Sequence, residues 1–236
     1  LELLPRLTLA AGVRFDHRST FLDIPNLFPP PPPFTGRKEN NVWSPKGSLT
    51  WAFAEQSAAW VSLSQAYRLP SASDIASGDP RFASNAALVP VDARTVEFGV
   101  RSQRHKLLGG SLALYRSWVA DDVFFDPAFL GFGGNNNADA VKQGVELTLN
   151  SRPAEWLDAE VAVTYTDAHF TSGPYAGQRL VLVPDWQLNG GVNLRPAPGW
   201  LWRIETVYVT GQRRVNDLPN TLSQNTYTVV NTKVSY

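Results

Sequence analysis

Two adjacent carboxylates and a distant histidine are the residues in this sequence best suited to catalysis. Asp121, Asp122 and His169 could together activate a water for hydrolysis of a peptide bond. No spacing forces the three side chains to meet, so we interpret them as solvated loop residues. His17 and His105 are isolated, and the sequence contains no Ser/His/Asp motif, glycine-rich phosphate loop or nucleic-acid signature. The sequence therefore predicts neither a catalytic nor a metal site.

Arginines and a tyrosine occur in two polar stretches that could bind a ligand. Guanidinium groups can pair with an anionic chelate, and a tyrosine ring can stack on aromatic groups. Simple solvation, or contact with lipopolysaccharide phosphates, would explain the same residues. The candidates lie in GPYAGQR and GQRRVND: Tyr175, Gln178, Arg179, Arg213, Arg214 and Asn216.

Composition limits the kind of protein that these residues belong to. The chain has 236 residues, with 21 basic and 21 acidic side chains, so no net charge favours nucleic acid. It contains no cysteine, which excludes a disulfide framework and thiolate metal sites. It contains no methionine and opens without a signal peptide, so we expect an internal piece of a larger protein. No apolar run approaches the roughly 20 residues of a spanning helix, so a membrane-spanning structure would have to be made of strands.

The stretch 137–170 gives the clearest structural signal. Apolar and polar residues alternate strictly in two runs, which is typical of strands with one dry and one wet face. The short connection Arg152–Glu155 contains Pro153 and predicts an antiparallel hairpin. We expect Val145, Leu147, Leu149, Val161 and Val163 to face lipid, and Glu146, Thr148, Glu160 and Thr164 to face a lumen.

Similar runs recur along the whole chain, and their connections alternate between long and short. Long loops are expected to begin at His17, Arg68, Ala120, His169 and Gly211, whereas tight turns are expected near Glu55, Gln103, Pro153 and Pro196. The proline run 29–33 should be a stiff spacer in the first loop, and a bulge is expected near 115–118. Loop asymmetry of this kind favours a transmembrane antiparallel up-and-down β-barrel, an all-β fold, over a soluble sandwich with mixed connections.

Aromatic residues at the strand ends support the same prediction, because membrane barrels have two aromatic belts. One predicted belt lies near the tight turns and the other near the long loops: Trp51, Phe53, Trp60, Trp156, Trp200, Trp202 and Tyr236, then Phe15, Tyr67, Trp118, Tyr165, Trp186 and Tyr208. Charged residues on the opposite faces should point into the lumen, since charges in a dry core would cost several kcal/mol each. These are Arg14, Lys46, Glu97, Arg101, Glu146, Asp158, Glu160, Arg203, Glu205 and Lys233.

These stretches together resemble the carboxy-terminal part of the β-barrel of a TonB-dependent outer-membrane receptor. The resemblance is carried by LTLAAGVRFDH, SPKGSLTWAFAEQSAAWVSLSQAYRLPSASD, VEFGVRS, LALYRSWVADDVFF, QGVELTLNSRPAEWLDAEVAVTYTDAHF, GPYAGQRLVLVPDWQLNGGVNLRP and NTYTVVNTKVSY. It implies that residues 1–236 are one partial barrel domain with about ten of roughly 22 strands. The plug domain, with its TonB box, and the final strands would lie outside this chain.

The resemblance also implies a function. The intact protein would be a monomeric receptor in the bacterial outer membrane, in contact with its lipid, that imports a scarce ligand by TonB-driven displacement of the plug. Ferric siderophores are the commonest ligands of the family, and haem, cobalamin and saccharides are alternatives. The lumen charges would then pair with the plug. An omptin-like protease in a small barrel, which would use the Asp121–Asp122 pair and His169, is the enzymatic alternative.

Overall fold

The computed structural model describes all residues except 1, 5, 25–33, 77–78, 80 and 106, and it shows one antiparallel sheet. The sheet has 11 strands, each paired with its neighbour in sequence except where β10 pairs with β13. The predicted all-β, up-and-down architecture is confirmed, and one continuous sheet excludes a sandwich. The strands are β1 (Glu2–Leu4), β2 (Leu7–Ile24), β3 (Phe34–Ala54), β4 (Ser57–Arg68), β5 (Val91–Ser102), β6 (Leu108–Asp126), β7 (Gly134–Ala154), β8 (Leu157–Phe170), β9 (Trp186–Leu194), β10 (Leu201–Val209) and β13 (Tyr227–Ser235).

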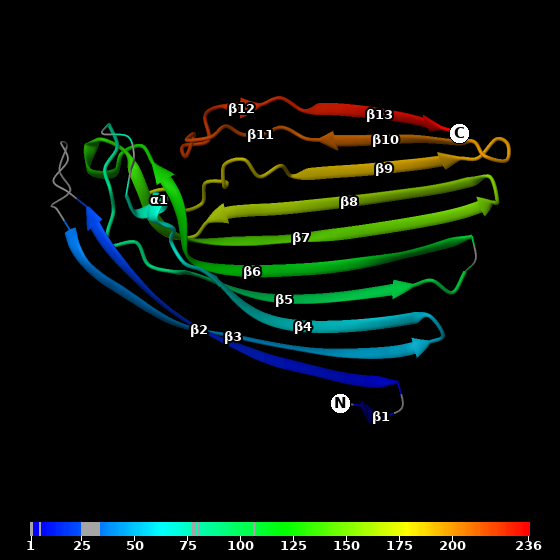
Figure 1. The fold of residues 1–236 in the computed structure, drawn as a ribbon, viewed down its shortest axis with the longest axis horizontal. Coiled ribbons are helices and arrows are strands. Elements are labelled where there is room, and N and C mark those ends of the chain that lie inside the picture. Colours follow the sequence, from blue (N-terminus) through cyan, green and yellow to red (C-terminus); the bar gives the residue numbers. More distant parts are fainter. Residues whose placement is uncertain (1, 5, 25–33, 77–78, 80, 106) are drawn as a thin grey trace.

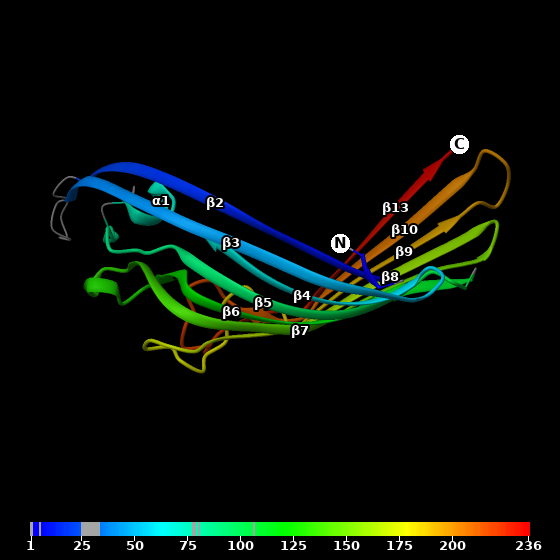
Figure 2. The same cartoon turned by 90° about the horizontal axis from the view of Figure 1, so that it is seen from below.

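The connections are sorted between the two ends of the sheet. Figure 1 shows the tight turns at one end and the long connections at the other, here called the long-loop end. The turns after β3 and β7 have two residues each, Glu55–Gln56 and Glu155–Trp156. At the long-loop end lie α1 (Ala72–Ile75), η1 (Phe129–Gly131) and the short hairpin of β11 (Gln212–Arg213) and β12 (Ser223–Gln224). Described residues of β1 and β13 form the two edges and do not pair with each other, so the sheet is an open, curved section (Figure 2).

Two of the predicted long loops are mostly strand. The loop expected from His17 to Asn41 is occupied by β2 and β3, which pair up to Ile24 and Phe34. The loop expected from Ala120 to Ala138 is likewise occupied by β6 and β7, which pair up to Asp126 and Gly134. Backbone pairing continues here without apolar alternation, and alternation was the only signal that defined strand ends. The proline run 29–33 lies outside the described residues.

Two local expectations were misplaced by a few residues. Residues 115–118 pair regularly with both neighbouring strands, and the irregularity lies instead between Val119 and Asp122. Asp121 adopts a φ of 57° there, and its backbone N–H donates to the Asp139 carboxylate at 3.1 Å. The hairpin turn expected at 152–155 is formed by Glu155 and Trp156, because the irregular segment around Pro153 still belongs to β7.

The pairing register sorts the side chains onto two faces. We call outer the face that carries Val145, Leu147 and Val163, and inner the face that carries Glu146, Thr148 and Thr164. Large apolar side chains of the outer face are strongly exposed across the sheet, among them Val13 at 65%, Leu63 at 62% and Phe98 at 52%. A broad exposed apolar surface of this kind marks contact with lipid or with another protein.

Trp60 does not belong to an aromatic belt on the outer face, as the sequence had suggested. It lies opposite Gly99, on the face of Glu97, and its indole Nε1 donates to Glu97 Oε1 at 2.6 Å. The belt interpretation was based on its position near a turn. Along β4 the side chains alternate between the two faces, and this alternation places Trp60 on the inner face. The other predicted tryptophans of both belts are exposed, from 43% at Trp202 to 56% at Trp51.

The buried apolar residues gather at the long-loop end. One cluster joins strands β5 to β8 with the following loops, and Phe170 and Leu218 are at its centre, 2% and 0% exposed. A second cluster packs Ile75 of α1 and Leu88 against Leu22 and Ile24 of β2. Described residues of the segment 69–90 thus contact both the long β2–β3 hairpin and the β6–β7 hairpin. In the described part of the chain no helix has the length and apolar character needed to cross a membrane.

Candidate ligand-binding crown and inner face

Loops 171–185 and 210–226 form one connected structure at the long-loop end, here called the crown. Residues 178–180 turn back along β8, with Phe170 N–H donating to Gln178 O at 2.9 Å and Leu180 N–H to Ala168 O at 3.0 Å. Asn220 joins the two loops, because its side chain accepts from Arg179 N–H at 2.7 Å and donates to Arg179 O at 3.1 Å. The crown is therefore held by specific bonds between segments distant in sequence.

Tyr175 is engaged within the crown. Its hydroxyl donates to Asp126 Oδ1 at 3.0 Å, and its ring lies 6.1 Å from the Phe124 ring and 6.4 Å from the Phe170 ring, measured between centroids. Burial, and then the hydrogen bond to the Asp126 carboxylate, raise the pKa of Tyr175 above its usual value. The side chain ties loop 171–185 to β6, so its free surface is limited.

The three predicted arginines differ in how freely they can meet a ligand. Arg179 pairs with Asp185 through both of its terminal nitrogens, and one of these contacts is 2.8 Å. Arg213 donates to Asn220 O at 3.0 Å. Arg214 is exposed, and no described residue forms a side-chain ion pair with it. Arg214 is thus the cation of the crown most available to an anionic ligand.

The remaining candidates lie on either side of these arginines. Asn216 is exposed at the tip of loop 210–226 with a φ of 64°, and Gln178 is half-buried beside β8. The tip is shaped by Asp217, which sequence reasoning missed. Its buried carboxylate accepts from Leu222 N–H at 2.6 Å, from Thr221 N–H at 3.0 Å and from Thr221 Oγ1 at 2.8 Å. Burial raises the pKa of Asp217, but these hydrogen bonds outweigh it and the pKa lies below its usual value.

The catalytic alternative lacks a common site. Asp122 lies on the inner face, 3.4 Å from Lys142 Nζ, whereas His169 lies opposite Val141 on the outer face. His169 Nδ1 is 3.7 Å from Asp167 Oδ1, so a different carboxylate is its neighbour. Across the described residues, no group of three or more His, Asp or Glu side chains is arranged to hold a metal ion.

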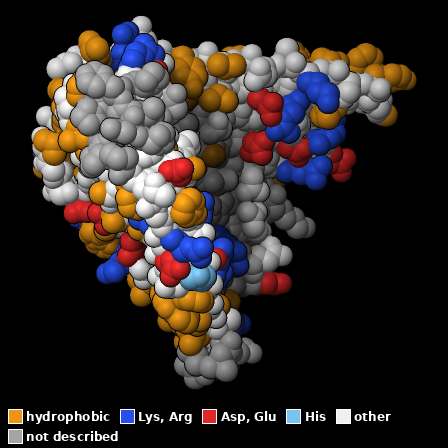
Figure 3. Space-filling view, turned by 60° about the vertical axis from the view of Figure 1, so that its left-hand side comes forward, with side chains coloured by type: hydrophobic (Ala, Val, Ile, Leu, Met, Phe, Trp, Pro, Cys, Tyr) orange, Lys and Arg blue, Asp and Glu red, His pale blue; other side chains and the backbone are white. Residues whose placement is uncertain are grey.

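Charged residues of the inner face are partly paired within the sheet. Arg203 lies 3.1 Å from Glu160 and 2.7 Å from Glu205, and Asp158 lies 2.5 Å from Arg195. By contrast, no described residue forms an ion pair with Lys46, Arg101, Glu146 or Lys233. Figure 3, which brings the long-loop end forward, shows acidic and basic side chains mixed in clusters rather than segregated by sign. The inner face is thus a charged surface on which several groups are available to a second body.

Two inner aromatic residues rest on glycines. A Cβ atom on Gly99 would lie 2.2 Å from Trp60 Cζ2, and one on Gly144 would lie 2.8 Å from the Tyr115 hydroxyl oxygen. The Tyr115 hydroxyl is 3.1 Å from Thr166 Oγ1. These two glycines therefore leave the room that the Trp60 and Tyr115 side chains occupy.

Comparison with known proteins identifies one family and several solved structures that share this fold. The profile of the family described as TonB dependent receptor-like, beta-barrel matches residues 1–236. The ferric yersiniabactin uptake receptor FyuA from Yersinia pestis is similar, with a TM-score of 0.78, 19% identity, and coverage of 98% of this chain and 36% of that one. The siderophore receptor PiuA from Acinetobacter baumannii has a TM-score of 0.76 and 19% identity, with coverage of 98% of this chain and 34% of that one. The copper transporter OprC has a TM-score of 0.77 and 16% identity, with coverage of 96% of this chain and 36% of that one. This chain therefore spans about a third of the length of these solved receptors.

Proposed function

Because this chain belongs to the TonB-dependent receptor β-barrel family, we propose that the protein containing it imports a ferric siderophore across the bacterial outer membrane. The observation that carries the proposal is the match of the family profile over residues 1–236, joined to the sorting of long loops and tight turns at opposite ends. In outer-membrane barrels the short turns face the periplasm and the long loops face outside. The crown would then meet the ligand first, and the outer face would meet lipid.

The inner face suits the step of transport in which the plug is displaced. A receptor barrel of this family encloses a plug whose displacement by TonB opens the path. Lys46, Arg101, Glu146 and Lys233 have no ion-pair partner among the described residues, so they can pair with plug residues and exchange those partners for water during displacement. Pairing that is made and broken in a wet lumen costs little, because exposed ion pairs are worth about 0–1 kcal/mol each.

Arg214 is the crown residue that most favours an anionic ferric chelate. Its guanidinium group is exposed, always charged, and has five donors that suit carboxylate, catecholate or hydroxamate oxygens. Arg179 already shares its donors with Asp185 and contributes charge only if that pair opens. Gln178, Arg213 and Asn216 complete the same surface and would supply hydrogen bonds. Tyr175 would act by fixing the loop that carries them.

This chain offers few suitable ligand residues for copper or haem. Copper(I) prefers thiolate and thioether ligands, and the chain has neither cysteine nor methionine. Haem is usually held by an axial histidine, and His169, which lies nearest to the crown, is a neighbour of Asp167 on the outer face.

A ligand screen on cells that express the full-length receptor tests the ligand class. Labelled ferric siderophores of the catecholate, hydroxamate and carboxylate classes would be compared with haem, cobalamin, oligosaccharides and copper. We expect saturable binding of one ferric siderophore class, weakened about tenfold by Arg214→Ala, as expected for loss of one charge-assisted contact. Arg104→Ala, at the tight-turn end, is the matched control and should bind normally. Saturable binding of haem, cobalamin, saccharide or copper alone would overturn the siderophore assignment.

A further inference from the structure

The outer face carries two arginines among apolar residues. Arg94 of β5 lies directly opposite Trp118 of β6, and Arg116 lies opposite Val96 two residues along the same pair of strands. The Arg94 side chain is 69% exposed, Trp118 is 47% exposed, and the Arg116 guanidinium carbon lies 5.2 Å from the centre of the Trp118 ring. An arginine on the lipid face of a barrel costs about 2–4 kcal/mol at the midplane and about 0–1 kcal/mol near the interface. Both arginines are therefore expected at the level of the lipid headgroups.

The register across the sheet gives an independent test of that level. One row of paired outer residues runs from Tyr208 of β10 to Trp51 of β3: Tyr208, Leu188, Val163, Leu147, Leu112, Val100, Ala59 and Trp51. Tyr208 is the last apolar outer residue of β10, because Thr210 follows it. On β3 the last is Trp43, which is 51 − 43 = 8 residues beyond Trp51 and is followed by Asn41 on the same face.

This drift of the apolar boundary matches the tilt of strands in a barrel. Eight residues at about 3.3 Å each are about 26 Å, and the seven strand steps from β3 to β10, at about 4.8 Å each, are about 34 Å. The boundary therefore runs at about 38° to the rows, within the 35–45° range of strand tilts in outer-membrane barrels. An edge drawn from Tyr208 to Trp43 thus crosses β5 at the level of Arg94 and β6 at the level of Arg116.

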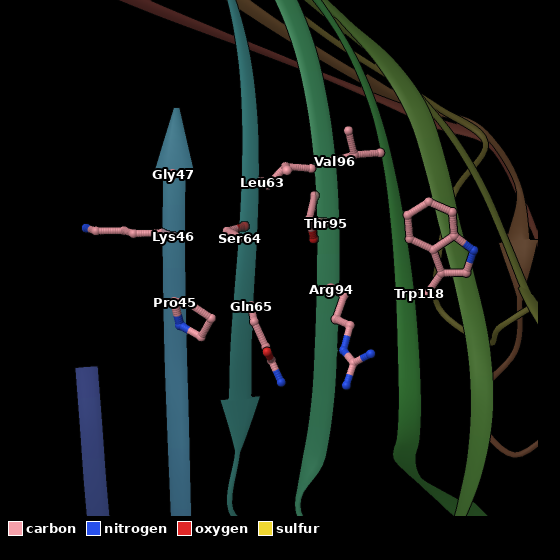
Figure 4. A pocket seen from close by; sticks show the side chains of 10 residues that line it. All are labelled: Pro45, Lys46, Gly47, Leu63, Ser64, Gln65, Arg94, Thr95, Val96 and Trp118. Carbon is pink, nitrogen blue, oxygen red and sulfur yellow. The ribbon is translucent and has the colours of Figure 1, made fainter. Parts of the chain in front are cut away.

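A shallow groove leads from this edge down the outer face. Leu63 of β4 and Val96 of β5 lie side by side in it, while Gln65 and Arg94 point toward the long-loop end and Trp118 lies alongside (Figure 4). Its apolar part suits an acyl chain and its cationic end suits a phosphate. Arg116 lies beside the groove, opposite Val96 and close to the Trp118 ring. Resting on the membrane placement proposed above, we propose that the groove and Arg116 together, here called the Arg94–Arg116 site, bind lipopolysaccharide through a lipid A phosphate and one acyl chain.

The local charge supports an anionic headgroup. Arg94 lies 3.3 Å from Asp92, but that carboxylate also accepts two hydrogen bonds from Gln65 Nε2, at 3.0 and 2.9 Å. No described residue forms an ion pair with Arg116, so Arg94 and Arg116 together exceed the one carboxylate that contacts them, that of Asp92, by one positive charge. Arg94 and Arg116 are diagonal neighbours across two strands, which places their backbones roughly 7–8 Å apart, and two flexible side chains at that spacing can bracket one phosphate. Lipopolysaccharide is the anionic lipid that we expect at this site, because the long-loop end faces the outer leaflet, where lipopolysaccharide lies.

The test is lipid binding by the purified full-length receptor in detergent, followed by native mass spectrometry. The probes are lipid A, lipid A without phosphates, and phosphatidylglycerol. We expect lipid A to bind about 10- to 30-fold more tightly than its dephosphorylated form, and the double variant R94Q/R116Q to lose this difference. R14Q/R101Q, with both changes on the inner face, is the matched control and should keep it.

Each other outcome overturns the proposal in a definite way. Equal binding of lipid A by R94Q/R116Q and the unsubstituted receptor would show that the two arginines do not form the site. Equal binding of phosphatidylglycerol and lipid A would make it a general anionic-lipid site and refute the assignment to lipopolysaccharide. Heat-modifiable migration on gels verifies that every variant is folded. Siderophore binding, measured on the same preparations, is independent of this site, so failure here leaves the proposed transport function to its own test.

Discussion

Arginine substitutions at the adjacent positions 147 and 148 should differ sharply in their effect on folding into a bilayer. Leu147 lies on the outer face between Leu112 and Val163, near the middle of the apolar stretch of β7. Leu147→Arg should destabilise the folded barrel by about 2–4 kcal/mol, because the guanidinium group would meet hydrocarbon. That cost corresponds to about a 30- to 900-fold loss in the folding equilibrium constant.

The neighbouring change should be nearly neutral. Thr148 lies on the inner face opposite Ser111 and Ala162, and it borders the same groove as Glu160. Thr148→Arg would therefore place a cation in a wet surface with a carboxylate nearby, where exposed pairs contribute only about 0–1 kcal/mol.

Urea titration of the full-length receptor in phosphatidylcholine vesicles measures both values, with heat-modifiable migration as the readout of folding. Equal destabilisation by the two variants would refute the assignment of the faces. Greater loss with Thr148→Arg would show that the sheet faces are reversed.

Three further outcomes follow from the inner face and the crown. Gly99→Leu should lower the yield of folded receptor, since its side chain would collide with the Trp60 ring, and Trp60→Ala in the same chain should restore it; absence of rescue would mean that the ring is not the obstacle. Tyr175→Phe leaves buried Asp126 without one hydrogen bond, a loss of about 1–3 kcal/mol, so amide exchange in residues 171–180 should quicken while the sheet stays protected. The lowered pKa of Asp217 means that its stabilising contribution is complete above the unfolded value of about 3.9 and is lost as pH falls through the lower folded value. Pepsin cleavage of loop 210–226 should therefore rise below about pH 4, and Asp217→Asn should remove that dependence.

Side-chain alternation predicted much of the fold because it reports directly on a sheet with one apolar face. Leu147 and Val163, both expected on the lipid-facing side, lie opposite each other on the outer face, and the turn between their strands is displaced by only a few residues from the expected segment 152–155. Trp60 shows where the reasoning failed. Its position near a turn suggested an aromatic belt on the outer face. Its place in the alternation of side chains along β4, which puts it on the inner face, was the better guide.

Other features had no local signal to find. The outer parts of β2 and β3 continue through polar residues, where backbone pairing is indifferent to hydropathy. Asn220 and Asp217 organise the crown through bonds to Arg179 and Leu222 that depend on how two loops meet in space. Such contacts between distant segments leave no periodic trace in a single sequence.

TonB-dependent uptake of iron is the most direct test of the central proposal. Cells expressing the full-length receptor as their sole uptake route would be given the siderophore class identified by binding, loaded with radioactive iron, and compared in the presence and absence of TonB. Saturable accumulation of iron that requires TonB, with surface binding that does not, is the predicted result. Accumulation that persists without TonB, or binding with no uptake in its presence, would contradict the proposal that this chain is part of an energised siderophore importer.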